Sequence, residues 1–154
     1  MDISDVASLC GIIFGVTGAT LGAMSYFRDK AKIVVTLKWD LKIVNNPTYD
    51  ENKLWGMVTV TNVGRRPIFI SAAALILPKK YDDVLVLFES LGGSKLGEGD
   101  QPATYFINQG DLEEFSKDWY KIHAEVQDST GKNYSSKKVS KKNIPSWVKL
   151  KGIH

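Results

Sequence analysis

The chain has 154 residues, with a formal net charge of +3, 44% hydrophobic residues and 24% charged residues. These fractions are ordinary for a folded protein and exclude an intrinsically disordered chain, which is poorer in apolar residues. The single cysteine, Cys10, excludes an internal disulfide and agrees with a reducing compartment. The chain has no internal repeat and is long enough for one globular domain beside any membrane segment.

The first predicted element is an uncharged run of 22 residues from Val6 to Phe27. About 20 apolar residues cross the hydrocarbon core of a bilayer. A signal peptide would begin with basic residues and have a shorter core, whereas this chain begins with Asp2 and Asp5. A helix on the membrane surface would need a charged face, and a buried helix of a soluble domain usually keeps a polar stripe. We therefore predict an N-terminal transmembrane anchor over residues 1–30, spanning the bilayer at about 6–27.

Small residues follow one side of this predicted helix. At 100° per residue, the four glycines of the run fall within an arc of about 80°, and they form two GxxxG pairs. Small residues let two helix backbones approach closely in lipid, although glycine is also generally common in membrane helices. We predict a helix-packing face against a second copy or another membrane helix. It consists of Ala7, Gly11, Gly15, Gly18, Gly22 and Ser25.

Charge next to the run predicts its orientation. Arg28, Lys30 and Lys32 follow it, with only Asp29 against them, and no lysine or arginine precedes it. The positive-inside rule then places the C-terminal side in the cytoplasm and the N-terminus outside. The predicted location is the inner (cytoplasmic) membrane, with a single pass.

The remainder reads as a β domain over residues 31–142, followed by a basic tail over 143–154. Residues 33–43 alternate between apolar and polar side chains, which is typical of a strand with one buried face. Further strands are predicted at 54–62, 68–77, 84–88, 105–107, 119–128 and 132–139. The apolar run 84–88 is expected to be covered on both faces, 91–99 to be a flexible connection and 111–116 a short helical turn. About seven strands with frequent turns favour an antiparallel β-sandwich.

Two segments resemble bacterial immunoglobulin-like domains. From Val58 to Ile70, the order of a strand, Asn62, Gly64, a proline and a second strand resembles their second and third strands. Residues 126–134 are similar to their last hairpin. The whole plan resembles uncharacterised small bacterial membrane-anchored proteins with an immunoglobulin-like β-sandwich. The resemblance implies turn-forming roles for Asn62 and Gly64 and supplies no catalytic residues.

The sequence offers no motif for catalysis, cofactor binding or metal binding. His123 is the only internal histidine, and by strand alternation it faces solvent. No metal-ligand spacing, CxxC pair or G-x-S-x-G elbow is present. The carboxylates between Asp111 and Asp118 do not have EF-hand spacing and are expected in a solvated segment. We predict a protein without enzymatic activity, and no catalytic, cofactor or metal residues.

Lysines gather at the C-terminus. Residues 129–154 hold seven lysines and no acidic residue. Near a bilayer such a segment attracts anionic lipid, and it also suits an acidic partner. Alternatively, the lysines protect an exposed edge strand from pairing with other chains. The absence of arginine argues against specific nucleic-acid recognition. The predicted contact residues are Lys137, Lys138, Lys141, Lys142, Trp147, Lys149 and Lys151.

These features predict a membrane-anchored interaction or adaptor module whose cytosolic β-sandwich binds a protein partner. The alternative is a self-associating effector that perturbs the bilayer in phage defence or phage exclusion. The glycine face and small size permit the alternative, and oligomerisation in membranes separates the two hypotheses.

Overall fold

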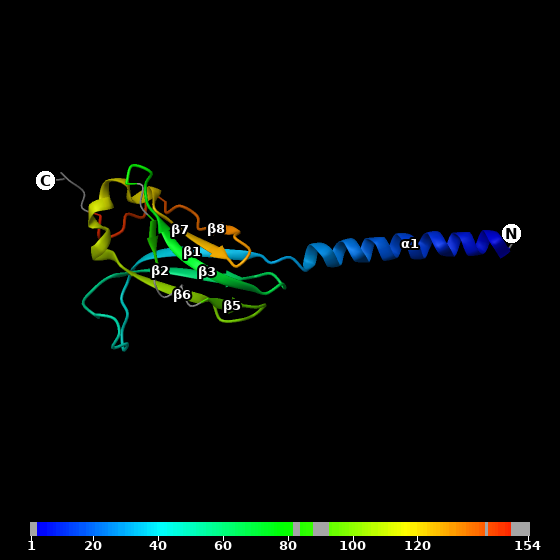
Figure 1. Ribbon diagram of the computed structural model, residues 1–154, viewed down its shortest axis with the longest axis horizontal. Helices are drawn as coiled ribbons and strands as arrows, with labels where there is room; N and C mark the ends of the chain where they lie inside the picture. Colours follow the sequence, from blue (N-terminus) through cyan, green and yellow to red (C-terminus); the bar gives the residue numbers. More distant parts are fainter. Residues whose placement is uncertain (1–2, 82–83, 88–92, 141, 149–154) are drawn as a thin grey trace.

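A computed structural model describes residues 3–81, 84–87, 93–140 and 142–148. One long helix, α1 (Ile3–Arg28), projects from one end of a β domain, with its N-terminus far from the domain (Figure 1). The predicted apolar helix is confirmed: its window Cys10–Phe27 has a mean hydropathy of 1.4, and none of it is buried. Its length and composition fit a membrane span, and a signal sequence at an N-terminus shares both properties.

Two hydroxyl groups inside α1 are satisfied by the helix itself. Thr17 Oγ1 donates to the carbonyl oxygen of Ile13, and Thr20 Oγ1 donates to that of Val16, both at 2.7 Å. A polar group without a partner costs several kcal/mol in hydrocarbon, about the cost of a lost hydrogen bond there. The two threonines are therefore compatible with an apolar surrounding.

The domain consists of two antiparallel sheets (Figure 1). The first has the order β1-β2-β6, formed by β1 (Ile33–Leu41), β2 (Trp55–Asn62) and β6 (Ala103–Asn108). The second has the order β4-β3-β7-β8, formed by β4 (Val84–Val86), β3 (Ile68–Ile76), β7 (His123–Asp128) and β8 (Asn133–Ser135). A short strand, β5 (Ser94–Leu96), also pairs with β3. A 3₁₀ element, η2 (Gln109–Lys121), joins β6 to β7.

The core lies between the two sheets and follows from the alternation in the strands. Val58 and Val60 of β2 are fully buried, as are Ile70 of β3 and Val126 of β7. Burying each such side chain contributes about 1.5–3 kcal/mol. The mainly β fold with two sheets is confirmed, and the described residues contain eight strands where about seven were predicted.

The prediction of a fully covered strand at 84–88 is wrong. Val84, Leu85 and Val86 are 54%, 36% and 53% exposed, because β4 is a short strand at the edge of its sheet. Phe88 lies outside the described residues. The predicted flexible connection at 91–99 is also wrong in part, since β5 forms within it and Leu96 is buried.

The strand predicted at 119–128 begins later than expected. Residues up to Lys121 belong to η2, and the strand begins at His123. Three residues on successive turns of η2 are buried, namely Leu112, Phe115 and Trp119. Their spacing is that of one face of a helical element. The helical turn predicted at 111–116 is thus part of a longer element. The strand predicted at 132–139 is limited to β8.

Candidate functional site

The junction between α1 and the domain is held by backbone contacts. The backbone N–H of Val63 donates to the carbonyl oxygen of Lys32 at 2.8 Å. A Cβ atom at Gly64 would collide with the carbonyl oxygen of Lys30 and the nitrogen of Lys32. The chain after α1 therefore lies directly against the turn between β2 and β3. This contact fixes the domain close to the end of the helix.

Asn62 holds the same turn together from inside. Its Oδ1 accepts from the N–H of Gly64 at 3.0 Å, and its Nδ2 donates to the carbonyl oxygens of Arg66 at 2.9 Å and Leu96 at 3.0 Å. The side chain is buried, so these bonds satisfy polar groups that water does not reach. Asn62 and Gly64 shape the turn, as predicted, and Gly64 also receives the chain that leaves α1.

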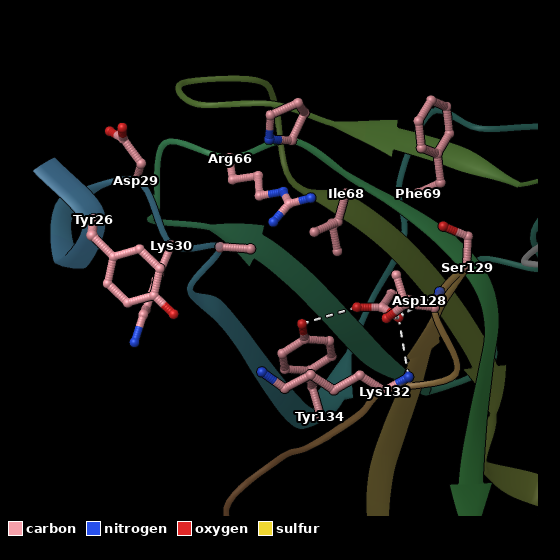
Figure 2. Close-up of a pocket in the computed structure, with 13 residues that line it drawn as sticks. Tyr26, Asp29, Lys30, Arg66, Ile68, Phe69, Asp128, Ser129, Lys132 and Tyr134 are labelled. Atoms are coloured by element: carbon pink, nitrogen blue, oxygen red, sulfur yellow. Dashed lines mark hydrogen bonds between the residues drawn. The ribbon is translucent and has the colours of Figure 1, made fainter.

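A cleft of about 640 Å³ opens at this junction (Figure 2). Tyr26, Asp29 and Lys30 line it from the helix side. The domain contributes residues from the start of β3 and from the β7–β8 hairpin, chiefly Arg66, Phe69, Asp128, Lys132 and Tyr134. These residues are far apart in the sequence, and no sequence motif joins them.

Asp128 is the buried acidic group of this cleft. Its Oδ1 accepts from the N–H of Thr130 at 2.8 Å, from the Thr130 hydroxyl at 2.5 Å and from the N–H of Lys132 at 3.1 Å. Its Oδ2 accepts from the Tyr134 hydroxyl at 3.0 Å. Burial raises the pKa of Asp128, but the hydrogen bonds together outweigh burial and leave the pKa below its ordinary value. Burial and this hydrogen bond both raise the pKa of Tyr134.

The basic side chains of the cleft have no carboxylate partner within the described part of the chain. Lys30 Nζ lies 4.9 Å from the ring centroids of Tyr26 and Phe27, and Lys132 Nζ lies 5.0 Å from that of Tyr134. Arg66 makes no ion pair among these residues. These three cations are therefore available to an anion.

A second surface lies between β4, an edge strand of the second sheet, and β6, an edge strand of the first sheet. A groove of about 310 Å³ is lined by β4 residues Leu85 and Val86 and by β6 residues Phe106 and Ile107, with Leu112 of η2. Among the described residues, β4 pairs only with β3 and β6 pairs only with β2. In the described part of the chain, β4 and β6 thus stand at the ends of their sheets, beside an apolar groove.

The predicted helix-packing face is open along its whole length. All of its members, Ala7, Gly11, Gly15, Gly18, Gly22 and Ser25, are exposed. A Cβ atom added at any of the four glycines would meet nothing within 4 Å. The face is available to a second helix, and whether one packs there stays a prediction.

The described members of the predicted C-terminal contact set differ in their exposure. Lys137, Lys138 and Lys142 are exposed, whereas Lys141, Lys149 and Lys151 lie outside the described residues. Trp147 is only 7% exposed and stacks edge-to-face on Trp39, with ring centroids 5.7 Å apart. The indole is therefore not available at a lipid surface, which corrects that part of the prediction. The segment 143–148 lies at the end of the domain away from α1 (Figure 1), and its Trp147 and Val148 belong to the buried core.

His123 and Asp118, which were considered for catalysis, contact neighbouring protein groups. His123 is half-buried, and its Nδ1 lies 3.1 Å from the carbonyl oxygen of Lys121. Asp118 accepts from Lys121 at 2.8 Å and from Lys80 at 3.4 Å, and the Lys121 bond is the main cause of its lowered pKa. No group of three or more metal-ligating side chains occurs in the described part of the chain.

Comparison with known proteins adds no relative. No family model matches the chain, and a search of curated proteins found no match. The resemblance to immunoglobulin-like domains therefore stays a prediction, and the function has to be argued from the surfaces above.

Proposed function

We propose that this protein is a membrane-anchored, non-enzymatic interaction module. In this proposal α1 crosses the inner membrane once, and the domain lies in the cytoplasm and binds a protein partner at the edge of β4. The basic residues after the run, among them Lys30 and Lys32, support this orientation through the positive-inside rule. The immunoglobulin-like character of the sandwich is part of the proposal and rests on the resemblance alone.

The apolar edge at β4 is the observation that carries this proposal. Natural sheets usually protect their edges with charged residues, proline or a covering segment. All three side chains of β4 are apolar and exposed instead. An extended peptide pairing with this backbone would place alternate side chains in the adjoining groove beside Phe106. Pairing of this kind supplies affinity through main-chain hydrogen bonds and specificity through the groove.

Site-specific cross-linking tests this surface. A photo-reactive residue in place of Leu85 in the full-length chain should yield one discrete adduct in membranes. Val86→Lys should abolish the adduct, because a buried ammonium would oppose strand pairing. Val34→Lys is the matched control, since Val34 is an exposed valine of β1 outside the groove. Adducts that persist with Val86→Lys, or disappear equally with Val34→Lys, contradict the proposal.

Anchoring is tested independently of binding. The full-length chain should remain in the membrane after an alkaline carbonate wash, and protease added from outside should leave the domain intact. Release by the wash contradicts the anchor. Appearance of a shortened chain that lacks α1 identifies a signal sequence and also contradicts it.

A second candidate is the self-associating effector, favoured by the open glycine face. Gly15→Leu with Gly18→Leu should abolish oligomers in membranes and any loss of membrane potential on induced expression. Ile13→Leu with Val16→Leu is the control, because Val16 and Ile13 lie about 130° and about 170° from the middle of the glycine arc. Oligomers unaffected by the glycine substitutions exclude a homotypic face.

A further inference from the structure

We propose that the cleft between α1 and the domain binds the phosphate headgroup of an anionic membrane lipid. This inference rests on the proposed membrane anchor and adds a ligand site at its cytoplasmic end. The residues that carry it are Arg66, Lys30 and Lys132, with Tyr26 and Phe69 as apolar neighbours.

The first argument is depth in the membrane. The apolar window ends at Phe27. Tyr26, in the last turn of the window, lines the cleft together with Asp29 and Lys30, which follow the window. Aromatic side chains at the end of a span sit at the level of the headgroups. The contact between Gly64 and the chain after α1 keeps the domain at this level. If α1 spans the bilayer, the cleft therefore opens among lipid headgroups.

The second argument is charge. Among the described residues, three basic and two acidic side chains line the cleft. Asp128 is 4% exposed and already accepts four hydrogen bonds from its own hairpin. Figure 2 shows the Asp29 carboxylate pointing away from the space between Arg66 and Lys132. Lys30, Arg66 and Lys132 thus line the cleft, and none of them has an ion-pair partner among the described residues.

The third argument is the chemistry of the donors. A guanidinium presents a planar pair of N–H groups that matches two phosphate oxygens, and an ammonium adds a point charge. Ring contacts with Tyr26, Phe27 and Tyr134 hold the two ammonium groups in place. Phe69 is 53% exposed at the cleft and gives an acyl chain an apolar surface that a soluble phosphate would not use. Together these features favour a lipid over a free phosphate.

The neighbouring arginine provides a matched control. Arg65 lies on the same turn and carries the same charge, but it pairs with Glu98 at 3.7 Å and does not line the cleft. Arg65→Gln and Arg66→Gln therefore remove the same charge at nearly the same depth. A difference in lipid affinity between the two variants would therefore indicate binding in the cleft and not general attraction to an anionic surface.

Native mass spectrometry of the full-length chain in a neutral detergent tests the site. Phosphatidylglycerol should bind as a first adduct at least about tenfold more tightly than phosphatidylcholine, whose choline opposes the cations. Arg66→Gln and Lys132→Gln should each weaken phosphatidylglycerol binding about fivefold, and the double variant more than tenfold. Arg65→Gln should bind like the unmodified chain. Glycerol 3-phosphate should bind far more weakly than the lipid.

Several results would overturn the site. Equal binding of the two lipids would contradict a preference for anionic headgroups. Equal effects of Arg65→Gln and Arg66→Gln would contradict binding in the cleft. Glycerol 3-phosphate binding as tightly as the lipid assigns the cleft to a soluble phosphate. Failure of the anchor itself is recognised separately, because the chain is then released by the carbonate wash whatever its lipid affinity.

Discussion

At each end of the β domain, a glycine leaves room for another part of the chain to pack closely against it, and the part that packs there differs between the two ends. At the end near α1, the space above Gly64 is filled by the backbone of Lys30–Lys32. At the opposite end, the space above Gly56 is filled by the ring of Trp39, which in turn contacts Trp147. The first contact places the helix on the domain, whereas the second packs the opposite end of the β domain. We therefore expect substitutions at the far end to affect folding most, and those at the near end to affect attachment and lipid binding.

The far end is also tied by a polar network around Asp40. Ser146 donates to the Asp40 carboxylate from its N–H at 3.0 Å and from its hydroxyl at 2.5 Å. With its amide oriented to satisfy both partners, the buried Gln109 donates to Asp40 Oδ1 at 3.1 Å and accepts from the Asp40 N–H at 2.7 Å. Asp40 has a positive φ of 61° at a bulge in β1. The bulge thus joins η2 and the C-terminal turn to the first sheet.

Trp147→Ala is expected to have the largest effect, because it removes the whole indole ring that packs on Trp39. Truncation of a buried tryptophan costs about 3–5 kcal/mol in the free energy of unfolding. Chemical unfolding of the full-length chain in detergent measures it. Trp147→Phe should lower the free energy of unfolding clearly less than Trp147→Ala does. A loss below about 1 kcal/mol would show that the C-terminal turn does not contribute to the core.

Gly64→Ala should have the next largest effect. The added methyl group meets backbone atoms that cannot move aside as a side chain would, and such overpacking costs about 1–3 kcal/mol. The distinctive result should be faster tryptic cleavage after Lys30 and Lys32, because the chain leaving α1 is displaced. Gly110→Ala is the control, since its Cβ would meet only the Asn108 side chain, with the nearest atom, Oδ1, at 3.4 Å. Unchanged cleavage with Gly64→Ala would mean that this contact does not hold the junction.

Asp128→Asn should weaken the hairpin of the near end in a pH-dependent manner. The lowered pKa means that the ionised Asp128 stabilises the fold above the unfolded-state pKa of about 3.9, and that this stabilisation is lost as the pH falls through the folded-state value. At pH 7 the variant should lose about 1–2 kcal/mol through weakened hydrogen bonds.

Unfolding titrations across the acid range measure this effect. The difference between the unmodified chain and Asp128→Asn should shrink as the pH falls below about 4. A difference that stays constant with pH would show that the carboxylate charge does not contribute. Thr130→Ser keeps the hydroxyl that donates to Asp128 and should retain the full pH dependence.

Alternation along the chain was sufficient to predict the longer strands, because each buries one face against the core. It failed at β4, where an apolar run forms an exposed edge, and at η2, where Leu112, Phe115 and Trp119 already had helical spacing. The periodicity of a sequence indicates which side chains share a face, but it does not indicate how many strands pair with a given strand.

The cleft and the burial of Trp147 were not predictable in the same way. The cleft joins the end of α1 to residues 66–69 and 128–134, which only the tertiary fold brings together. Trp147 stands among lysines in the sequence, and only the bulge at Asp40 shows why its turn packs inward. Asn62 and Gly64, by contrast, were predicted from a local turn motif.

Lys137→Gln with Lys138→Gln should have the smallest effect and separates the two basic regions most directly. The N–H of Ser136 donates to the carbonyl oxygen of Ala124 at 2.8 Å, so the chain after β8 continues along β7 toward its His123 end. Five residues of extended chain carry Lys137 roughly 15 Å beyond Lys132, farther than the screening length of about 8–10 Å in physiological salt. The double variant should therefore change unfolding by no more than about 0.5 kcal/mol, as expected for exposed positions. In the lipid titration it should match the unmodified chain. If it weakens phosphatidylglycerol binding as much as Arg66→Gln does, charge over the whole domain attracts lipid and the two ends are not different in this respect.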